Sequence, residues 1–355
     1  MFLMNRWYVA AVAEELTDRP LARTICGLPV VMFRTASGQV AALADRCPHR
    51  YAPLSAGTCT GETIACAYHG IEFDASGACA RIPHQPTIPS GMRVRAFPLV
   101  ERWGWAWIWL GDPLHADSET IPDYHWLGAP GWHSFRRHYP IKANWELCAD
   151  NLLDLSHTPF IHKKTVGVAE MATVPVRNWV EGNRVFQQRI MTQIMPSPFV
   201  AEWGNFAGKI DRRATVTWEP AANMDAELLY FDATNSITLR LTNPNTPETE
   251  NTTHVWFAWS RNFGSDSDDD AMAVRFKEQS FAVMAEDVSF MEIQQAGLDR
   301  AGDFTPVAIA ADATLMQARR IVERLRGEEA EEPRQLSAWD AGRPFTPKPR
   351  AQLRQ

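Results

Sequence analysis

Two short Cys/His segments constrain the fold more than any other feature of this sequence. The first is CPHR, at Cys47–Arg50, and the second is CAYHG, at Cys66–Gly70. Each segment offers one thiolate and one imidazole, so two loops must come together if the four side chains are to bind one metal centre. The flanking sequence consists of short apolar runs broken by turn residues, including the alternating stretch WAWIW. This pattern predicts an all-β domain over residues 1–114.

The distribution of the ligands favours an iron–sulfur cluster over zinc. Zinc modules with two cysteines and two histidines usually pair Cys with Cys in one loop and His with His in the other. In a dinuclear cluster, both cysteines can bind one iron and both histidines the other. If two loops bind such a cluster from opposite sides, each loop must supply one cysteine and one histidine. We therefore expect Cys47, His49, Cys66 and His69 to hold a [2Fe-2S] cluster that relays single electrons, with structural zinc as the alternative. The other cysteines lack this spacing and are expected in the core or at the surface: Cys26, Cys59, Cys79 and Cys148.

A second candidate site contains two histidines, His157 and His162, within LSHTPFIH. On a regular helix they would be about 140° apart, so both rings can meet one ion only if the helix ends between them. Pro159 is expected to supply that break by pushing Thr158 out of the α region. Asp154 would share a helix face with His157, where its carboxylate could hold a ring N–H or bridge to a neighbouring group. Two histidines and one carboxylate are typical of non-haem Fe(II) oxygenases, although core histidines without a metal are also common.

A third ligand is expected from residues 271–297, which predict an amphipathic helix. One stripe of this helix is mostly apolar and contains Ala273, Phe276, Ser280, Val283, Met284, Asp287, Phe290 and Met291. An unpaired carboxylate on a core-facing stripe costs several kcal/mol or more, so Asp287 should be protonated, ion-paired or bound to metal. Asp154 is the rival third ligand, and pairing of Asp287 with an arginine or a local turn is the plain alternative. Other acidic residues of this helix point to other faces, where solvent is the ordinary partner: Glu278, Glu286 and Glu292.

The rest of the chain predicts a second, α+β domain over residues 115–327. The chain has 355 residues, which is more than a domain with a single hydrophobic core usually contains. The second part mixes helix-like and strand-like stretches, which indicates an antiparallel sheet with helices packed on it. The predicted helices are 144–156, 271–297 and 314–326, and the predicted strands include 184–191, 213–218 and 254–259. The acidic run SDSDDD at 265–270 predicts a solvated loop or helix start, and residues 328–355 predict an extended or disordered tail.

Composition excludes several classes of partner. The net charge of −7 argues against a nucleic-acid or anionic-membrane surface. No segment approaches 18 uninterrupted apolar residues and no signal-peptide pattern is evident, so we expect a cytoplasmic protein. Glycine-rich dinucleotide and P-loop patterns are missing, which makes nicotinamide or flavin binding to this chain unexpected.

Taken together, these motifs resemble the oxygenase component of the Rieske non-haem iron family. The similarity is greatest to the monooxygenase branch with vanillate O-demethylase, dicamba O-demethylase and toluenesulfonate methyl-monooxygenase. It extends from NRWYVAA to about Gly327 and includes CPHR, CAYHG, DNLLDLSHTPFIH, TPETE, WSRNF and AEDVSFMEIQQ. The resemblance implies an N-terminal all-β Rieske [2Fe-2S] domain and a catalytic domain with an antiparallel sheet flanked by helices, of the helix-grip, START-like type.

The resemblance also implies roles for single residues. Cys47, His49, Cys66 and His69 would hold the cluster, and His157, His162 and Asp287 would hold a mononuclear Fe(II). Asp154 would carry the electron from the cluster of a neighbouring subunit in a head-to-tail homotrimer, and Asn151 would stand near the iron. Agreement is poorer between Ala169 and Asn245, where Asn243 is expected in the substrate pocket.

The expected activity is the oxidation of a methyl or methoxy group on a small aromatic acid. O2 would be the co-substrate, and electrons from NAD(P)H would arrive through a separate flavin- or ferredoxin-type reductase. Three alternatives remain open from the sequence: hydroxylation or N-demethylation of a heterocyclic compound, a zinc-stabilised protein that binds an apolar ligand, and an electron-transfer ferredoxin with an accessory domain.

Overall fold

The computed structural model describes residues 2–264, 271–302 and 306–331. The chain divides into two compact units, Met1–Asp123 with Leu325–Gln355, and Tyr124–Arg324. This division falls after Asp123 rather than after residue 114. Helix α5 continues to Glu331, so residues 328–331 are helical rather than an extended arm. The predicted loop at 265–270 and the tail from 332 onward lie outside the described residues.

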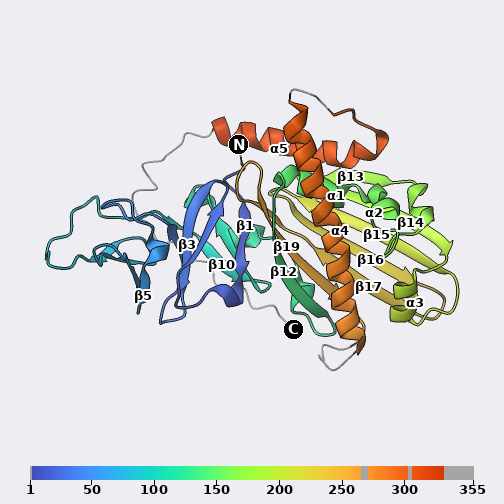
Figure 1. Ribbon diagram of the computed structural model, residues 1–355, viewed down its shortest axis with the longest axis horizontal. Coiled ribbons are helices and arrows are strands. Elements are labelled where there is room, and N and C mark those ends of the chain that lie inside the picture. Colours follow the sequence, from blue (N-terminus) through green and yellow to red (C-terminus); the bar gives the residue numbers. More distant parts are fainter. Residues whose placement is uncertain (1, 265–270, 303–305, 332–355) are drawn as a thin grey trace. The chain divides into compact units, whose positions relative to one another are not determined.

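The first unit consists of three small antiparallel sheets, as the alternating apolar pattern predicts (Figure 1). One sheet has the order β1-β11-β10, with β1 Trp7–Val12, β10 Leu99–Arg102 and β11 Trp105–Trp109. The second has the order β2-β3-β4-β9, with β2 Leu21–Ile25, β3 Leu28–Arg34, β4 Val40–Ala44 and β9 Ala96–Phe97. The third has the order β5-β6-β7-β8, with β5 Thr58–Thr60, β6 Thr63–Ala65, β7 Glu72–Asp74 and β8 Cys79–Arg81.

The two Cys/His segments lie in loops of this unit. CPHR follows β4, and CAYHG connects the antiparallel pair β6 and β7. Both cysteines reach into one apolar core, whose buried members include Val31, Phe33, Leu43, Leu54, Ile64 and Phe73. The core therefore fixes the bases of both loops.

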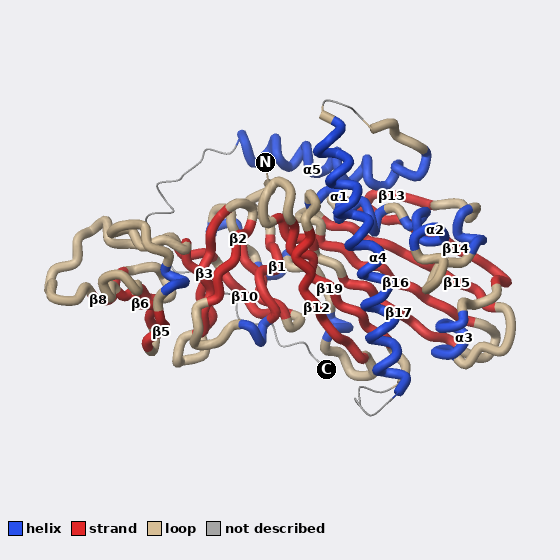
Figure 2. The backbone as a smooth tube through the Cα atoms, viewed as in Figure 1, coloured by secondary structure: helices blue, strands red, loops and turns tan. Residues whose placement is uncertain are grey.

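The second unit contains one eight-stranded antiparallel sheet (Figure 2). Its order is β12-β19-β17-β16-β15-β14-β13, and the short strand β18 pairs with β19. The strands are β12 His133–Ile141, β13 Arg177–Glu181, β14 Arg184–Ile194, β15 Ile210–Glu219, β16 Asn223–Phe231, β17 Ser236–Thr242, β18 Asn245–Pro247 and β19 Thr253–Arg261. The predicted antiparallel sheet and its three named strands are confirmed.

Helices pack on one face of this sheet, and α4 lies across it (Figure 1). The α-helices are α1 Trp145–Leu153, α2 Thr158–Ile161, α3 Pro198–Gly204, α4 Ala271–Ala301 and α5 Ala313–Glu331. Short 3₁₀ turns are η1 Ala13–Glu15, η2 Leu54–Ala56, η3 Pro113–His115, η4 Ser118–Thr120, η5 His125–Leu127, η6 Leu155–His157, η7 Ala169–Ala172 and η8 Ala310–Asp312. Within the described ranges, no helix combines the length and apolar character needed to span a lipid bilayer.

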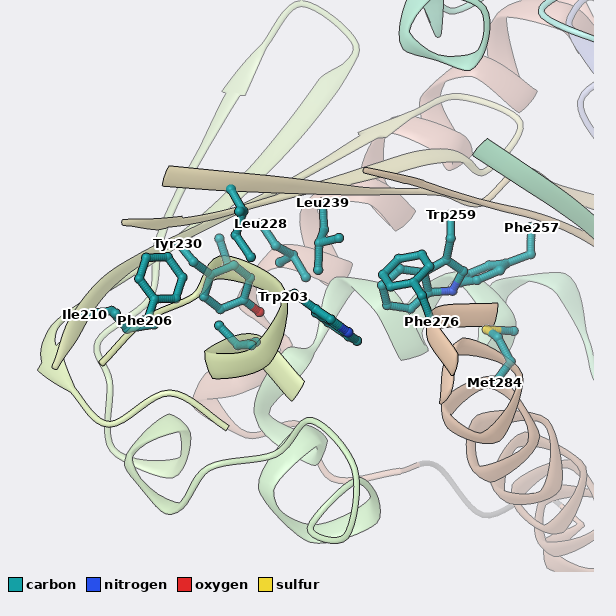
Figure 3. Packing of buried hydrophobic residues seen from close by; sticks show 13 residues of the cluster. Trp203, Phe206, Ile210, Leu228, Tyr230, Leu239, Phe257, Trp259, Phe276 and Met284 are labelled. Atoms are coloured by element: carbon teal, nitrogen blue, oxygen red, sulfur yellow. The ribbon is translucent and has the colours of Figure 1, made fainter. Parts of the chain in front are cut away.

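An aromatic core joins the sheet to α3 and α4. Figure 3 shows Trp203, Phe206, Tyr230, Trp259 and Phe276 of this core. Phe276 makes edge-to-face contacts with Trp203 and Trp259, at ring-centroid distances of 5.0 and 5.7 Å. Such pairs stabilise a core beyond the burial of their area. The part of the sheet face that meets α3 and α4 is thus largely apolar and well packed.

The buried stripe of α4 matches the sequence prediction with one exception. Ala273, Phe276, Ser280, Val283, Met284, Asp287 and Met291 are buried, together with Gln295. Phe290, which the helical wheel put on the stripe, is 44% exposed. Beyond Asp287 the buried face narrows to the row of residues four apart, and Phe290 lies to the side of that row.

Candidate metal centres

The two Cys/His loops have the same backbone geometry. Cys47 N donates to Ala52 O at 2.8 Å, and Cys47 O accepts from Tyr51 N at 2.9 Å. Cys66 makes the same two bonds, to the carbonyl five positions later and the amide four positions later, both at 2.8 Å. Tyr51 and Gly70, which follow the two histidines, have positive φ values of 59° and 65°. In each loop this left-handed residue donates its N–H to the cysteine carbonyl and so closes the turn.

The four side chains of these loops are arranged as a buried and an exposed pair. Cys47 and Cys66 are 1% and 2% exposed, whereas His49 and His69 are exposed. The two histidine Nδ1 atoms face each other at 3.1 Å. Burial, together with the neighbouring Cys66 thiol, raises the pKa of Cys47, although backbone N–H bonds oppose the shift. A bound metal would reverse this preference for the thiol, because it deprotonates a coordinating cysteine.

The spacing of these donors fits a two-metal cluster better than a zinc ion. The four donors of a tetrahedral zinc site lie within about 4 Å of one another. Among the described residues, no three of the donors at these loops meet even a 4.8 Å limit, because the one group that does is His157, His162 and Asp287. Two thiols at one end and two ring nitrogens at the other are the donor set of a Rieske [2Fe-2S] cluster.

A second cluster of donors lies in the other unit, where helix α4 meets the segment after α1. His162 Nε2 is 3.0 Å from Asp287 Oδ1, and His157 Nε2 is 3.5 Å from the same oxygen. All three donor atoms lie within 4.8 Å of one another. The structure thus brings together the three residues that the sequence predicted as iron ligands, and it places Asp154 outside this group.

The helix ends before the first of the two histidines, not between them as predicted. Helix α1 ends at Leu153, and Asp154 leaves the helical region with φ −124° and ψ 87°. Thr158 remains helical, with φ −51° and ψ −47°, and Pro159 stands in the first turn of α2. Proline is tolerated there because its missing N–H would have no helical partner. The prediction that Pro159 breaks the helix at Thr158 is therefore wrong, and the break occurs four residues earlier.

Each histidine is oriented by a second contact through its other ring nitrogen. His157 Nδ1 lies 2.6 Å from the backbone oxygen of Asp154, and His162 Nδ1 lies 2.8 Å from Glu286 Oε2. If both Nδ1 atoms carry the proton, both Nε2 lone pairs are free to bind a metal. The Asp154 carbonyl, not its carboxylate, holds the ring, and Glu286 contacts His162 rather than solvent alone.

The two histidines also differ in their electrostatic surroundings. Burial lowers the pKa of His157 despite the opposing charge of Asp287. Burial also acts on His162, but hydrogen bonds to Asp287 and Glu286 outweigh it and raise the pKa. The neutral, metal-binding form is therefore favoured more at His157 than at His162.

Two further residues support this cluster. Asn151, predicted to stand near the iron, donates from Nδ2 to Asp287 Oδ1 at 3.0 Å. Gly167 packs against the histidine segment, and a Cβ there would lie 2.5 Å from Thr158 O and 3.0 Å from His162 O. The sequence analysis missed Gly167 and the contact of Glu286, since both depend on tertiary approach.

A cavity of about 40 Å³ lies beside Asp287. Its apolar wall comes from both the sheet and the helices: Cys148, Leu152, Leu241, Val255, Phe257, Trp259, Val283, Met284 and Met291. Its polar residues are Asn151, Asn243, Asn245 and Asp287. Asn243 was expected here, whereas Asn245 was not. Asn245 is fully buried, and its Oδ1 has no hydrogen-bond partner among the residues that the structure describes.

Comparison with known proteins supports the two-domain organisation. Residues 6–98 match the Rieske [2Fe-2S] domain, and residues 141–328 match the vanillate O-demethylase oxygenase C-terminal domain. A putative toluene-4-sulfonate monooxygenase system iron-sulfur subunit of Comamonas testosteroni is 40% identical over 92% of this chain and 97% of its own. The dicamba O-demethylase oxygenase component of Stenotrophomonas maltophilia is 35% identical, covering 93% and 99%.

Solved structures give the same result. The crystal structure of dicamba monooxygenase bound to 3,6-dichlorosalicylic acid superposes with a TM-score of 0.86, at 33% identity over 93% of this chain and 99% of that one. Another crystal structure of dicamba monooxygenase, with non-haem iron and dicamba, has a TM-score of 0.80 at 32% identity, covering 94% and 99%. With its cysteine–histidine loops and its two-histidine, one-carboxylate cluster, this chain belongs to the Rieske non-haem iron monooxygenases, in the family of the vanillate O-demethylase oxygenase components.

Proposed function

We propose that this protein is a terminal oxygenase that oxidises a methyl or methoxy group of a small aromatic acid. The observation that carries the proposal is the convergence of His157, His162 and Asp287 beside a largely apolar cavity. The relatives named for toluene-4-sulfonate and dicamba support an aromatic substrate with an acidic group. Oxidation of an O-methyl carbon gives a hemiacetal that collapses to a phenol and formaldehyde, while oxidation of a C-methyl carbon leaves an alcohol.

The metal-binding residues divide between two centres. Cys47, His49, Cys66 and His69 would hold the [2Fe-2S] cluster, and His157, His162 and Asp287 would hold Fe(II). Bound there, the two centres supply one-electron storage and O2-dependent oxidation of a C–H bond.

The other side chains orient the site and shield it from water. Asn151 fixes one carboxylate oxygen of Asp287, while Glu286 and the Asp154 carbonyl fix the two rings. The apolar wall of the cavity would pack against the aromatic ring and exclude water from it.

The electron route and the assembly are further parts of the proposal. Asp154 would carry electrons to the iron from the cluster of a neighbouring subunit in a homotrimer. Its carboxylate accepts from Ser156 N and Oγ, both at 2.9 Å, and lies 3.6 Å from an Arg189 nitrogen. These contacts hold the carboxylate in place beside His157. A separate flavin- or ferredoxin-type reductase would supply the electrons, and we propose a cytoplasmic location.

A substrate screen tests the proposal. The protein, reconstituted with iron and sulfide, is combined with a surrogate reductase, NADH and a panel of methoxylated and methylated aromatic acids. Substrate-dependent oxygen uptake with stoichiometric formaldehyde is expected for an O-methyl substrate. Zinc in place of iron, with no acid-labile sulfide and no visible absorption, would show that the function is wrong.

A further inference from the structure

The side chain of Asn245, in β18, is a buried amide in the wall of the cavity beside Asp287. It is 0% exposed, and over the ranges that the structure describes its Oδ1 accepts no hydrogen bond. Its Nδ2 contacts Met224 Sδ at 4.0 Å, and a thioether is a weak acceptor. Its backbone N donates to Ala222 O at 3.0 Å, a bond that any residue except proline could make there. The fold therefore uses the backbone of this residue more than its amide group.

The strand register directs this side chain toward the cavity. Asn245 stands opposite Val255 of β19, and residues directly opposite each other in an antiparallel pair point to the same face of the sheet. Val255 lines the cavity, as do Phe257 and Trp259 at every second position after it. Both of these aromatic side chains are labelled in Figure 3. The amide of Asn245 thus lies on the cavity side of the sheet.

A buried acceptor without a donor destabilises the folded chain. Burial of an amide without its hydrogen bonds costs free energy, and native proteins pair the great majority of such groups. An apolar side chain of the same shape would be nearly neutral or stabilising at such a position, so the fold gains nothing from this oxygen. A ligand that brings a donor into the cavity would supply the missing bond.

The amide oxygen also selects the kind of group that can bind it. Elsewhere in the cavity, Asn151 Nδ2 donates to Asp287 Oδ1 at 3.0 Å. Asn243 Nδ2 donates to Trp256 O at 3.5 Å. An amide oxygen accepts hydrogen bonds and would repel the oxygens of a carboxylate or sulfonate. The partner of Asn245 Oδ1 must therefore be a donor, namely a hydroxyl or an N–H group.

We propose that Asn245 is a specificity-determining residue whose Oδ1 accepts a hydrogen bond from a hydroxyl or N–H group on the aromatic ring of the substrate. The role rests on the function proposed above and narrows its substrates to methylated or methoxylated aromatic acids that also carry such a donor. A site built to bind a polar group discriminates against analogues that lack the group, because its buried acceptor is then left unpaired.

Binding measurements without turnover test this role. The probes are 2-, 3- and 4-hydroxybenzoate, each compared with the methylbenzoate that carries its methyl group at the same ring position. Isothermal calorimetry on the iron-loaded protein, under anaerobic conditions and without a reductase, measures both affinities. We expect the wild type to bind at least one hydroxybenzoate about tenfold more tightly than its methyl counterpart. The aminobenzoate with the same substitution, which also offers a donor, should share this preference.

Two variants separate recognition from a structural role. Asn245→Leu removes the acceptor and keeps a side chain of similar size, so the two affinities of that pair should come within about twofold of each other. Leu241→Met, the matched control, changes the apolar wall without touching a polar atom and should keep the hydroxyl preference of the wild type. The thermal midpoint of ligand-free Asn245→Leu should not fall below that of the wild type, because a buried unpaired acceptor is lost.

The wild type alone can overturn the role. If it binds every hydroxybenzoate and its methyl counterpart equally well, no donor on the ring is recognised, as expected where an ordered water satisfies Oδ1. This comparison needs no variant and holds even if Asn245→Leu fails to fold. The role is also wrong if Asn245→Leu folds and keeps the hydroxyl preference of the wild type.

Turnover distinguishes this failure from failure of the proposed function. If the hydroxyl preference depends on Asn245 but no methylated or methoxylated aromatic compound supports oxygen uptake, the recognition role stands and the oxygenase function fails. If the wild type demethylates methoxybenzoates with and without a ring hydroxyl at equal kcat/KM, and binds the two probes of each pair equally well, the function stands and the role of Asn245 is overturned.

Discussion

His162 Nδ1 lies 2.8 Å from Glu286 Oε2, a contact between residues 124 positions apart in the chain. The same Glu286 oxygen also accepts from Thr165 Oγ1 at 3.1 Å. The carboxylate therefore has a fixed position from which it orients the imidazole, and it leaves Nε2 directed at Asp287. Partners of this kind raise the basicity of a metal-binding histidine and hold its ring in place.

Replacement of Glu286 should weaken the iron site without removing a ligand. Glu286→Gln is expected to lower iron affinity or activity about 10-fold and Glu286→Ala up to about 100-fold. The measurement is iron content after dialysis against a chelator, together with oxygen uptake. Glu278→Gln, on an exposed position of the same helix, is the control. Unchanged iron retention in Glu286→Ala would show that the contact does not support the metal.

Replacement of His157 should separate the two metal centres. His157→Ala removes an iron ligand in one unit and leaves Cys47, His49, Cys66 and His69 of the other unit unchanged. We expect the visible spectrum of the cluster to persist while product formation is abolished, with about two irons per chain instead of three. His115→Ala, at an exposed histidine, should behave as the wild type. Retained product formation in His157→Ala would show that His157 is not a ligand that the reaction needs.

Gly167 should be intolerant of even a small side chain. A Cβ at this position would lie within 3.0 Å of the His162 carbonyl oxygen and closer still to that of Thr158. We expect Gly167→Ala to cost about 1–3 kcal/mol of stability and to reduce iron retention, because the backbone that carries His162 must shift. The thermal midpoint and the iron content are the measurements. Gly208→Ala, where a Cβ meets nothing within 4 Å, is the matched control.

The sequence predicted the parts of the site that depend on local pattern. Helical periodicity placed Asp287 on the buried face of α4, and Cys/His spacing placed two loops in a β-rich unit. Contacts between distant segments had no such signal. The Glu286 contact depends on the approach of the segment after α2, and the close contact of Gly167 with the Thr158 and His162 carbonyls exists only in the folded chain. The sequence prediction put the end of the helix at the wrong residue because a proline such as Pro159 can also stand at the start of a helix.

The buried acid Asp225 should make the folded protein less stable as the pH rises toward neutrality. Burial raises its pKa from the ordinary 3.8 to about 7, although Arg240 at 2.6 Å lowers it. The folded protein therefore holds this proton more tightly than the unfolded chain does. The stability that results is fully present below about pH 4 and is lost as the pH rises to about 7, at roughly 1.4 kcal/mol per pH unit.

Asp225→Asn should remove this slope, so that its stability relative to the wild type improves between pH 5 and pH 7. Chemical unfolding at the two pH values measures the difference. Asp232→Asn is the control, because the backbone N–H groups of Asn235 and Thr234 lower the pKa of exposed Asp232. Stabilisation by an ionised Asp232 is lost only as the pH falls below about 4, so this substitution should leave the difference between pH 5 and pH 7 as it is in the wild type. Equal slopes in the wild type and Asp225→Asn would mean that Asp225 is ionised throughout this range, held so by Arg240.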